Sequence, residues 1–116
     1  MTTTMGSKWC ISVTERARLK TSKRWVVKIG SALLTNDGQG LDLTRMQAWV
    51  NQMHALIEDG VELCLVSSGA IAVGLQTLGL SKRPDELPML QAAAAIGQMG
   101  LVQAWQSCFA ATGHTT

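Results

Sequence analysis

Two short polar segments, each at the end of an apolar run, hold the residues best suited to chemistry in this sequence. The first, residues 28–31, reads Lys-Ile-Gly-Ser, and the second, residues 67–70, reads Ser-Ser-Gly-Ala. Burying an ammonium group without a partner is costly, so Lys28 must reach water or meet an anion that the fold holds in place. Gly30 and Gly69 let the backbone approach a ligand closely, and a helix starting after Gly69 offers free N–H groups and a positive dipole end. The pattern predicts two neighbouring anion sites, with a phosphate as the ligand beside Lys28.

Each of these signals also has a purely structural interpretation. A lysine near a strand end can extend its ammonium group into water along its own aliphatic stem. Ser-Ser-Gly before a helix is ordinary N-capping, and the Ser67 hydroxyl can simply end the strand. It is the occurrence of both segments in one chain that favours ligand binding.

The strands that must position these segments are visible as short apolar runs. Residues 26–29 predict a β-branched, buried strand, and residues 61–66 predict a second one. A helix between them makes a βαβ unit with parallel strands, so the fold class is α/β. In such a sheet ligands bind at the carboxyl ends of the strands, where both polar segments lie.

Helices are predicted from apolar spacing and from their caps. TNDGQG over residues 35–40 is a turn whose residues tolerate positive φ, and Asp42 or Thr44 caps the helix that follows and ends at Gly60. Two more helices are expected over residues 70–78 and 87–111. The side chains expected to pack from these helices are Met46, Trp49, Val50, Met53, Ile57, Met89, Leu90, Ala94, Met99, Leu101, Trp105 and Phe109.

Composition indicates one globular domain preceded by a polar leader. The chain has 116 residues, of which 47% are hydrophobic, and no apolar run approaches the roughly 18 residues of a membrane span. Six basic residues and one acidic residue precede Trp25, whereas four basic and seven acidic residues occur from Trp25 onward. We therefore expect a basic, disordered leader over residues 1–24 and a globular domain over residues 25–116 that binds neither nucleic acid nor a membrane.

The three cysteines and two histidines predict neither disulfides nor a metal site. The cysteines form no Cys-x-x-Cys pair, and no secretory signal precedes them, which is typical of reduced thiols in the cytoplasm. Cys64, inside the second strand, is expected to be a small buried hydrophobe. His54 and His114 lie far apart in the sequence, so no metal-ligating residues are predicted.

Familiar nucleotide-binding motifs do not account for the polar segments. GLQTLGLSK has Leu80 where a P-loop needs its phosphate-binding lysine, and GQGLDL has Leu43 in place of the third glycine of a dinucleotide fingerprint. From Arg24 to His114 the sequence instead resembles the amino acid kinase family. VVKIGSALLT is similar to the family's opening strand and glycine turn, LVSSGAIAVG to its second strand and substrate loop, and QAAAAIGQMGLVQAW to the helix that follows. Acetylglutamate kinases carry a Gly-Gly pair after the lysine, whereas Gly30-Ser31 favours the branch that phosphorylates glutamate itself.

The resemblance implies a fold, a reaction and roles for single residues. The fold is a three-layer sandwich with a mainly parallel sheet, incomplete in this chain. The reaction is phosphorylation of the γ-carboxylate of L-glutamate to L-glutamyl 5-phosphate, the first step of proline biosynthesis, with ATP and Mg²⁺ as cofactors. By resemblance Lys28 is catalytic and contacts the ATP phosphates, with Gly30 and Ser31 lining the same turn. Ser68, Gly69 and Ala70 hold the glutamate, and Ser67 is a weaker candidate.

The family also implies features that this sequence does not carry by itself. Proline is implied as a feedback inhibitor and a homo-oligomer as the assembly of the full-length enzyme. The remaining glutamate-site residues, the base pocket and a second phosphate lysine are expected beyond Thr116, so we expect the N-terminal part of a kinase domain, inactive alone. Two alternatives stay open: another phosphotransferase of the same family, and a truncated, non-catalytic module.

Overall fold

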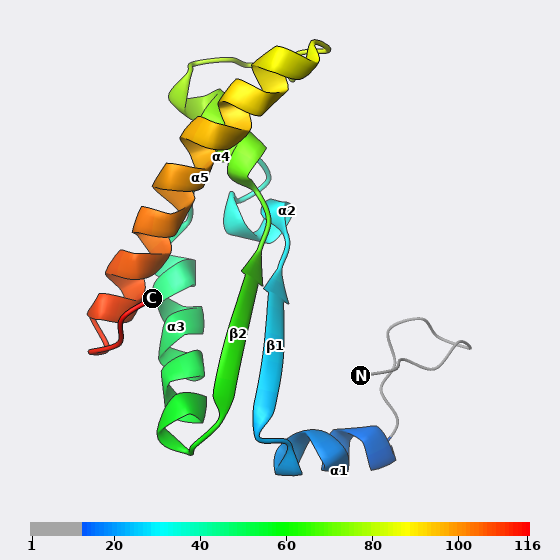
Figure 1. Cartoon of the computed structure of the whole chain (residues 1–116), viewed down its shortest axis with the longest axis vertical. Coiled ribbons are helices and arrows are strands. Elements are labelled where there is room, and N and C mark those ends of the chain that lie inside the picture. The colour runs from blue at the N-terminus through cyan, green and yellow to red at the C-terminus, as the bar shows by residue number, and fades with distance from the viewer. Residues whose placement is uncertain (1–12) are drawn as a thin grey trace.

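The structure, a computed structural model, describes residues 13–116 (Figure 1). None of the helices in this range combines the length and hydrophobicity needed to cross a bilayer. In chain order the elements are α1 (Val13–Thr21), β1 (Arg24–Ile29), α2 (Ser31–Leu34), α3 (Leu43–Glu58), β2 (Glu62–Ser67), α4 (Ala70–Thr77) and α5 (Leu87–Ala110).

The two strands pair in parallel, as the βαβ pattern predicts. The register aligns Arg24 with Glu62 and Ile29 with Ser67, so both strands end at the same level. Helix α3 forms the crossover between them, and α3 and α5 lie together beside one face of the sheet, while α2 and α4 lie at the carboxyl ends of the strands (Figure 1). This arrangement confirms the α/β class with a parallel sheet.

The hydrophobic core lies between that face of the sheet and helices α3 and α5. Of the two predicted caps, Asp42 and not Thr44 begins α3, because the Asp42 carboxylate accepts a hydrogen bond from the Arg45 backbone N–H at 3.0 Å. Gly60, with a φ of +87°, ends the same helix. The buried residues that form the core are Ile29, Leu34, Met46, Val50, Met53, Leu101, Trp105, Cys108 and Phe109.

Helices α4 and α5 pack backbone against backbone through small residues. A Cβ atom added at Gly74 would lie 1.7 Å from the Ala93 carbonyl oxygen, and one added at Gly97 would lie 1.7 Å from the Ala70 carbonyl oxygen. Only glycine fits at both positions. Ala93 belongs to the Ala92–Ala95 run, so part of that run serves close helix contact as well as helix propensity.

The outer face of the sheet departs from the prediction of two fully buried strands. The side chains alternate between the two faces, and those directed away from α3 and α5 are accessible: Val26 is 66% and Val66 43% exposed. Cys64, predicted to be buried, is also exposed on this face. The physical reason is that, within residues 13–116, helices cover the sheet on one side only.

Other differences concern short or exposed elements. Helix α1 lies within the expected leader, and β1 begins at Arg24, before the expected first strand residue Val26. The first half of the leader lies outside the described residues, and the limits of the two expected domains stay predictions. Helix α2 was not predicted. Met99 is 68% and Met89 39% exposed, so the prediction that they pack in the core is wrong, because no described element covers these two side chains.

Candidate active site at the strand ends

The carboxyl ends of β1 and β2 bring the two polar segments of the sequence together. The Ser68 backbone N–H donates a hydrogen bond to the Ile29 carbonyl oxygen at 3.2 Å, and the Ser68 hydroxyl donates to the same oxygen at 3.4 Å. These bonds extend the strand pairing by one residue. The first residues after both strands therefore start from fixed, adjacent positions.

Gly69 gives the second segment its sharp turn. Its φ of +105° lies in a region that favours glycine, and it is the N-cap of α4. A Cβ atom there would lie 3.5 Å from the Cβ atom of Ser31, which is the first residue of α2. The segments 30–31 and 69–70, far apart in the sequence, therefore lie next to one another. Helix α4 starts at this point, and the N–H groups of its first turn have no partner within the helix.

Gly30 differs from Gly69 in having no steric need to be glycine. Its φ is −78°, which any residue adopts, and a Cβ atom would meet nothing within 4 Å among the described residues. The turn after β1 is therefore open above its backbone. Space of this kind admits a ligand that touches the main chain.

Lys28 lies on the exposed outer face of the sheet, where its register partner is Val66. Within the described part of the chain no carboxylate lies within 4 Å of its ammonium group. The ammonium group of Lys28 therefore reaches water among the described residues. Because it is not buried, the fold does not require an anion beside it. Its position, two residues before Gly30, leaves the ammonium group available to an anion at the end of β1.

The loop between α2 and α3 supports the site from one side. Thr35 is buried, and its hydroxyl donates to the Ser31 carbonyl oxygen at 2.8 Å while accepting from the Gly38 N–H at 3.1 Å. The positive φ values predicted for this turn are present at Asn36, Asp37, Gly38 and Gly40. Gln76 of α4 donates to the Gln39 carbonyl oxygen at 3.1 Å, so the loop is also attached to the helix that follows the second segment.

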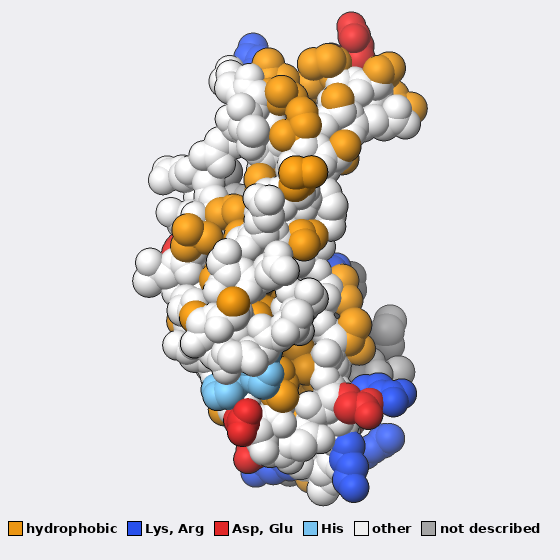
Figure 2. All heavy atoms as spheres, turned by 60° about the vertical axis from the view of Figure 1, so that its left-hand side comes forward, with side chains coloured by type: hydrophobic (Ala, Val, Ile, Leu, Met, Phe, Trp, Pro, Cys, Tyr) orange, Lys and Arg blue, Asp and Glu red, His pale blue; other side chains and the backbone are white. Residues whose placement is uncertain are grey.

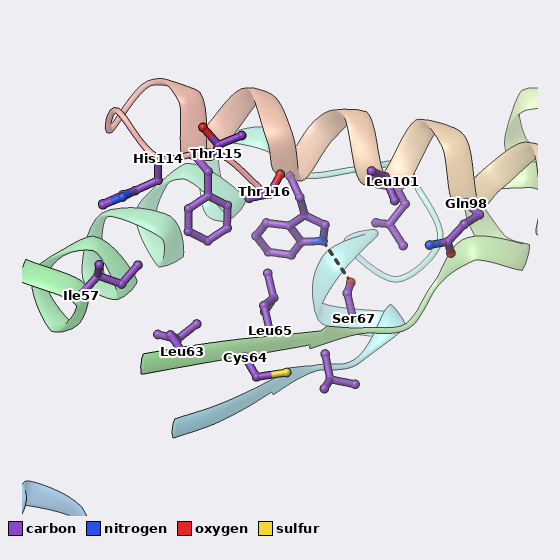
Figure 3. Close-up of a pocket in the computed structure, with 14 residues that line it drawn as sticks. Ile57, Leu63, Cys64, Leu65, Ser67, Gln98, Leu101, His114, Thr115 and Thr116 are labelled. Carbon is purple, nitrogen blue, oxygen red and sulfur yellow. Dashed lines mark hydrogen bonds between the residues drawn. The ribbon is translucent and has the colours of Figure 1, made fainter. Parts of the chain in front are cut away.

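A hollow of about 750 Å³ lies between β2 and α5 rather than at the strand ends (Figure 3). Its walls are largely apolar side chains of the core, among them Leu63, Leu65, Leu101 and Phe109. Ser67, the weaker candidate of the sequence, points into this hollow, where its hydroxyl accepts a hydrogen bond from the Trp105 indole at 3.1 Å (Figure 3). The residues that line the hollow include no lysine or arginine to pair with a phosphate, whereas Lys28 lies near the strand ends.

Sequence reasoning missed one cluster of polar side chains at the other end of the sheet. His54, Glu58 and His114 lie together, with their nearest ligand atoms all within 4.8 Å of one another. The spacing of His54 and Glu58 at i and i+4 was a usable signal, since it places both on one side of a helix. The approach of His114 depends on how α5 ends and could not be found from spacing.

One family match covers β1, β2 and helices α2 to α5. It extends over residues 23–116 and is described as the amino acid kinase family. The chain belongs to this family. Both polar segments therefore lie inside a region that is characteristic of amino acid kinases.

Individual relatives in this family are highly similar to the chain. It is 63% identical over 101 residues to a protein of Pseudomonas fluorescens (strain Pf0-1) named glutamate 5-kinase, an alignment covering 87% of this chain and 27% of the relative. Proteins with the same name from Hahella chejuensis and Hydrogenovibrio crunogenus are 60% identical over 101 residues and 64% identical over 95 residues. These alignments cover 87% and 81% of this chain, and 26% and 25% of the relatives. The chain thus spans about a quarter of the length of the curated relatives it matches.

Proposed function

We propose that this chain supplies the phosphate-binding and glutamate-binding loops of a glutamate 5-kinase. The reaction is transfer of the γ-phosphoryl group of ATP to the γ-carboxylate of L-glutamate, which gives L-glutamyl 5-phosphate for proline biosynthesis. The observation that carries this proposal is the proximity of Ser31 to Gly69, which sets the turn after β1 beside the turn after β2. Donor and acceptor of a phosphoryl group must lie side by side, and two adjacent loops of different chemistry meet that need.

Lys28 is proposed as the catalytic residue. Phosphoryl transfer spreads negative charge over the oxygens of the moving group, and a fixed cation stabilises that charge. The ammonium group of Lys28 is exposed and has no carboxylate within 4 Å among residues 13–116, so it is free to make this contact. It binds the phosphates and stabilises the group in transit.

The two turns have separate tasks in this proposal. Gly30 and Ser31 hold the phosphates, because the backbone there is open and Ser31 begins a helix with unpaired N–H groups. Ser68, Gly69 and Ala70 hold the glutamate, since the Ser68 hydroxyl and the first N–H groups of α4 can donate to a carboxylate. Binding the substrate exchanges the 3.4 Å hydrogen bond of the Ser68 hydroxyl to the Ile29 carbonyl for a stronger, charge-assisted one.

ATP and Mg²⁺ fit this arrangement in different ways. The open backbone at Gly30 and the exposed Lys28 suit the phosphates of ATP. Residues 28–31 and 67–70 include no carboxylate, so the strand ends offer Mg²⁺ no acidic ligand, and the ion would be held through the phosphates. When bound, ATP supplies the phosphoryl group and Mg²⁺ neutralises phosphate charge. Cytoplasmic location, assembly of the full-length enzyme into a homo-oligomer and inhibition by proline complete the proposal.

A chimeric enzyme tests this function. Residues 23–116 of this chain replace the matching segment of the Pseudomonas fluorescens relative, and the purified chimera is assayed with ATP, Mg²⁺ and a panel of acceptors containing glutamate, aspartate, acetylglutamate and carbamate. We expect turnover with glutamate, loss of that turnover in Lys28→Ala, and no turnover by the 116-residue chain alone.

Two outcomes would overturn the proposal. A chimera that prefers another acceptor would place the chain in a different branch of the family. A chimera that melts cooperatively but phosphorylates none of the acceptors, beside an active unmodified relative, would favour a non-catalytic module.

A further inference from the structure

His54, Glu58 and His114 form a cluster of metal-ligating side chains at the end of the sheet opposite the candidate active site. His54 and Glu58 lie in the last turns of α3, whose end leads into the start of β2 (Figure 1). The two imidazoles appear side by side on the surface, with an acidic side chain next to them (Figure 2). The cluster is therefore independent of the loops proposed for phosphoryl transfer.

The turn after α5 holds His114 against α3. The backbone N–H groups of Thr112 and His114 both donate to the Phe109 carbonyl oxygen, at 3.0 and 3.1 Å, and Gly113 has a φ of +83°. This turn reverses the chain at the end of α5. It directs the imidazole of His114 back to within 2.7 Å of His54, measured from Nε2 to Nδ1. The backbone thus fixes the approach of the two rings.

The distances are close to those of a divalent metal site. Zn²⁺ binds imidazole nitrogen and carboxylate oxygen at roughly 2.0–2.2 Å, which places tetrahedral ligand atoms about 3.3 Å apart. Here the two nitrogens are 2.7 Å apart, and the Glu58 Oε1 atom lies 3.9 Å from His54 Nδ1 and 4.0 Å from His114 Nε2. Side-chain rotations that shift these atoms by a few tenths of an ångström to one ångström would make the three ligand-to-ligand distances equal.

The set of ligand atoms selects the class of metal. Two imidazoles with one carboxylate suit Zn²⁺, Co²⁺ or Ni²⁺, whereas Mg²⁺ and Ca²⁺ prefer oxygen ligands. The side chains of His54, His114 and Glu58 are 36%, 25% and 65% exposed, so a metal can enter from solvent and keep a water molecule as a fourth ligand. Without metal one ring nitrogen donates its hydrogen to the other. Metal binding requires a lone pair on both His54 Nδ1 and His114 Nε2. The shared hydrogen must therefore move to the other nitrogen of its own ring, through exchange with water.

We propose that His54 Nδ1, His114 Nε2 and Glu58 Oε1 bind one Zn²⁺-type transition-metal ion, which clips the end of α5 to α3. The site joins two helices that the core already packs together. Its expected effect is on the stability of this end of the domain, because an ion that binds only the folded chain stabilises it.

Metal titration of the 116-residue chain tests the site. Cys10→Ser and Cys64→Ser are introduced first to remove competing thiols. Binding of Zn²⁺, Co²⁺ and Mg²⁺ is then followed by calorimetry, and Co²⁺ coordination by its visible absorption. We expect one Zn²⁺ per chain, a tetrahedral Co²⁺ spectrum, a higher melting temperature with Zn²⁺, and no binding of Mg²⁺ in the same concentration range.

Glu58→Gln is the decisive variant, and Asp59→Asn is its matched control. Glu58 is well exposed, so its replacement leaves the fold intact, which circular dichroism without metal verifies. We expect Glu58→Gln, His54→Gln and His114→Gln each to weaken Zn²⁺ binding by roughly tenfold or more, and Asp59→Asn to leave it unchanged. Equal binding by Glu58→Gln and the parent chain would reduce the cluster to a hydrogen-bonded histidine pair, as would the absence of a saturable site in the folded parent.

Discussion

The indole N–H of Trp105 donates a hydrogen bond to the hydroxyl oxygen of Ser67 at 3.1 Å, joining α5 to the last residue of β2. The same Ser67 hydroxyl donates to the Ser68 carbonyl oxygen at 3.3 Å. A helix far along the chain thereby holds the residue that precedes the proposed glutamate loop. Ser67 has a positioning role here, which explains its presence without substrate contact.

Replacing Trp105 by Phe should destabilise the 116-residue chain by about 1–2 kcal/mol, because the hydrogen bond is lost while most of the ring packing stays. Ser67→Ala should cost about as much, since it leaves the indole N–H without its acceptor. The double variant should be less destabilised than the sum of the two single ones. Urea unfolding of the three variants measures this, and strict additivity would show that the bond contributes nothing of its own.

Replacing Lys28 by Ala in the chimera should lower kcat roughly a hundredfold and change the KM for glutamate little. The cation is needed most where phosphoryl charge develops, so its loss affects the transition state more than substrate binding. Lys28→Arg should also be poorly active, because a planar guanidinium replaces a compact ammonium. Steady-state kinetics provide the measurement. Lys82→Ala, which removes an exposed lysine outside the site, serves as the control and should be fully active. Near-normal kcat in Lys28→Ala would exclude Lys28 as the catalytic residue.

Replacing Ser68 by Ala should raise the KM for glutamate about tenfold in the chimera and affect the KM for ATP less. The hydroxyl and the adjacent N–H groups lie on the loop proposed for the substrate carboxylate. Ser107→Ala, on an exposed side of α5, is the matched control. Ser68→Ala could instead lower the melting temperature and raise the KM values for glutamate and ATP equally. That result would show that the hydroxyl acts only through its hydrogen bond to the Ile29 carbonyl oxygen.

Local chemistry explains the parts of the fold that were predictable from sequence. The cap formed by Asp42, the helix end at Gly60 and the positive φ values in the turn over residues 35–40 each depend on a few neighbouring residues. Parallel pairing of the strands follows from the length and handedness of a βαβ connection. These features place the polar segments 28–31 and 67–70 at one end of the sheet, and the structure confirms that placement.

Features that depend on tertiary packing were not predictable in this way. The exposure of Val26 and Cys64 depends on which faces of the sheet are covered, and an apolar run does not reveal that. Helix α2 has only four residues, too few for a periodic signal. The approach of His54 to His114 depends on where α5 ends against α3. Each of these requires knowing where one element sits on another.

The cysteines should differ in reactivity according to burial. Burial raises the pKa of the Cys108 thiol, which lowers its thiolate fraction at neutral pH, whereas Cys64 is exposed on the outer face of the sheet. In a Cys10→Ser chain at pH 8, iodoacetamide should therefore label Cys64 well before Cys108, as peptide mass spectrometry would measure. A raised pKa also means that the folded state holds this proton more tightly than the unfolded one. The contribution of the protonated Cys108 thiol to the free energy of unfolding should be present at neutral pH and lost as the pH rises through the alkaline range. Equal labelling rates in the native chain would contradict the burial of Cys108.

Two glycines of α5 offer a sharp contrast in packing. Gly97→Ala should destabilise the chain by more than about 2 kcal/mol, because the new Cβ atom would lie 1.7 Å from the Ala70 carbonyl oxygen and must push α4 away. Gly100→Ala, one turn later in the same helix, places its Cβ atom 3.5 Å from Val73 Cγ1, an ordinary contact. That variant should gain up to about 1 kcal/mol from better helix propensity. Because Ala70 is also the last residue of the proposed glutamate loop, Gly97→Ala in the chimera should raise the KM for glutamate, whereas Gly100→Ala should leave it unchanged. Urea unfolding measures the stability of both variants, and steady-state kinetics measure their KM for glutamate. Equal stabilities of Gly97→Ala and Gly100→Ala would contradict the close backbone packing of α4 against α5.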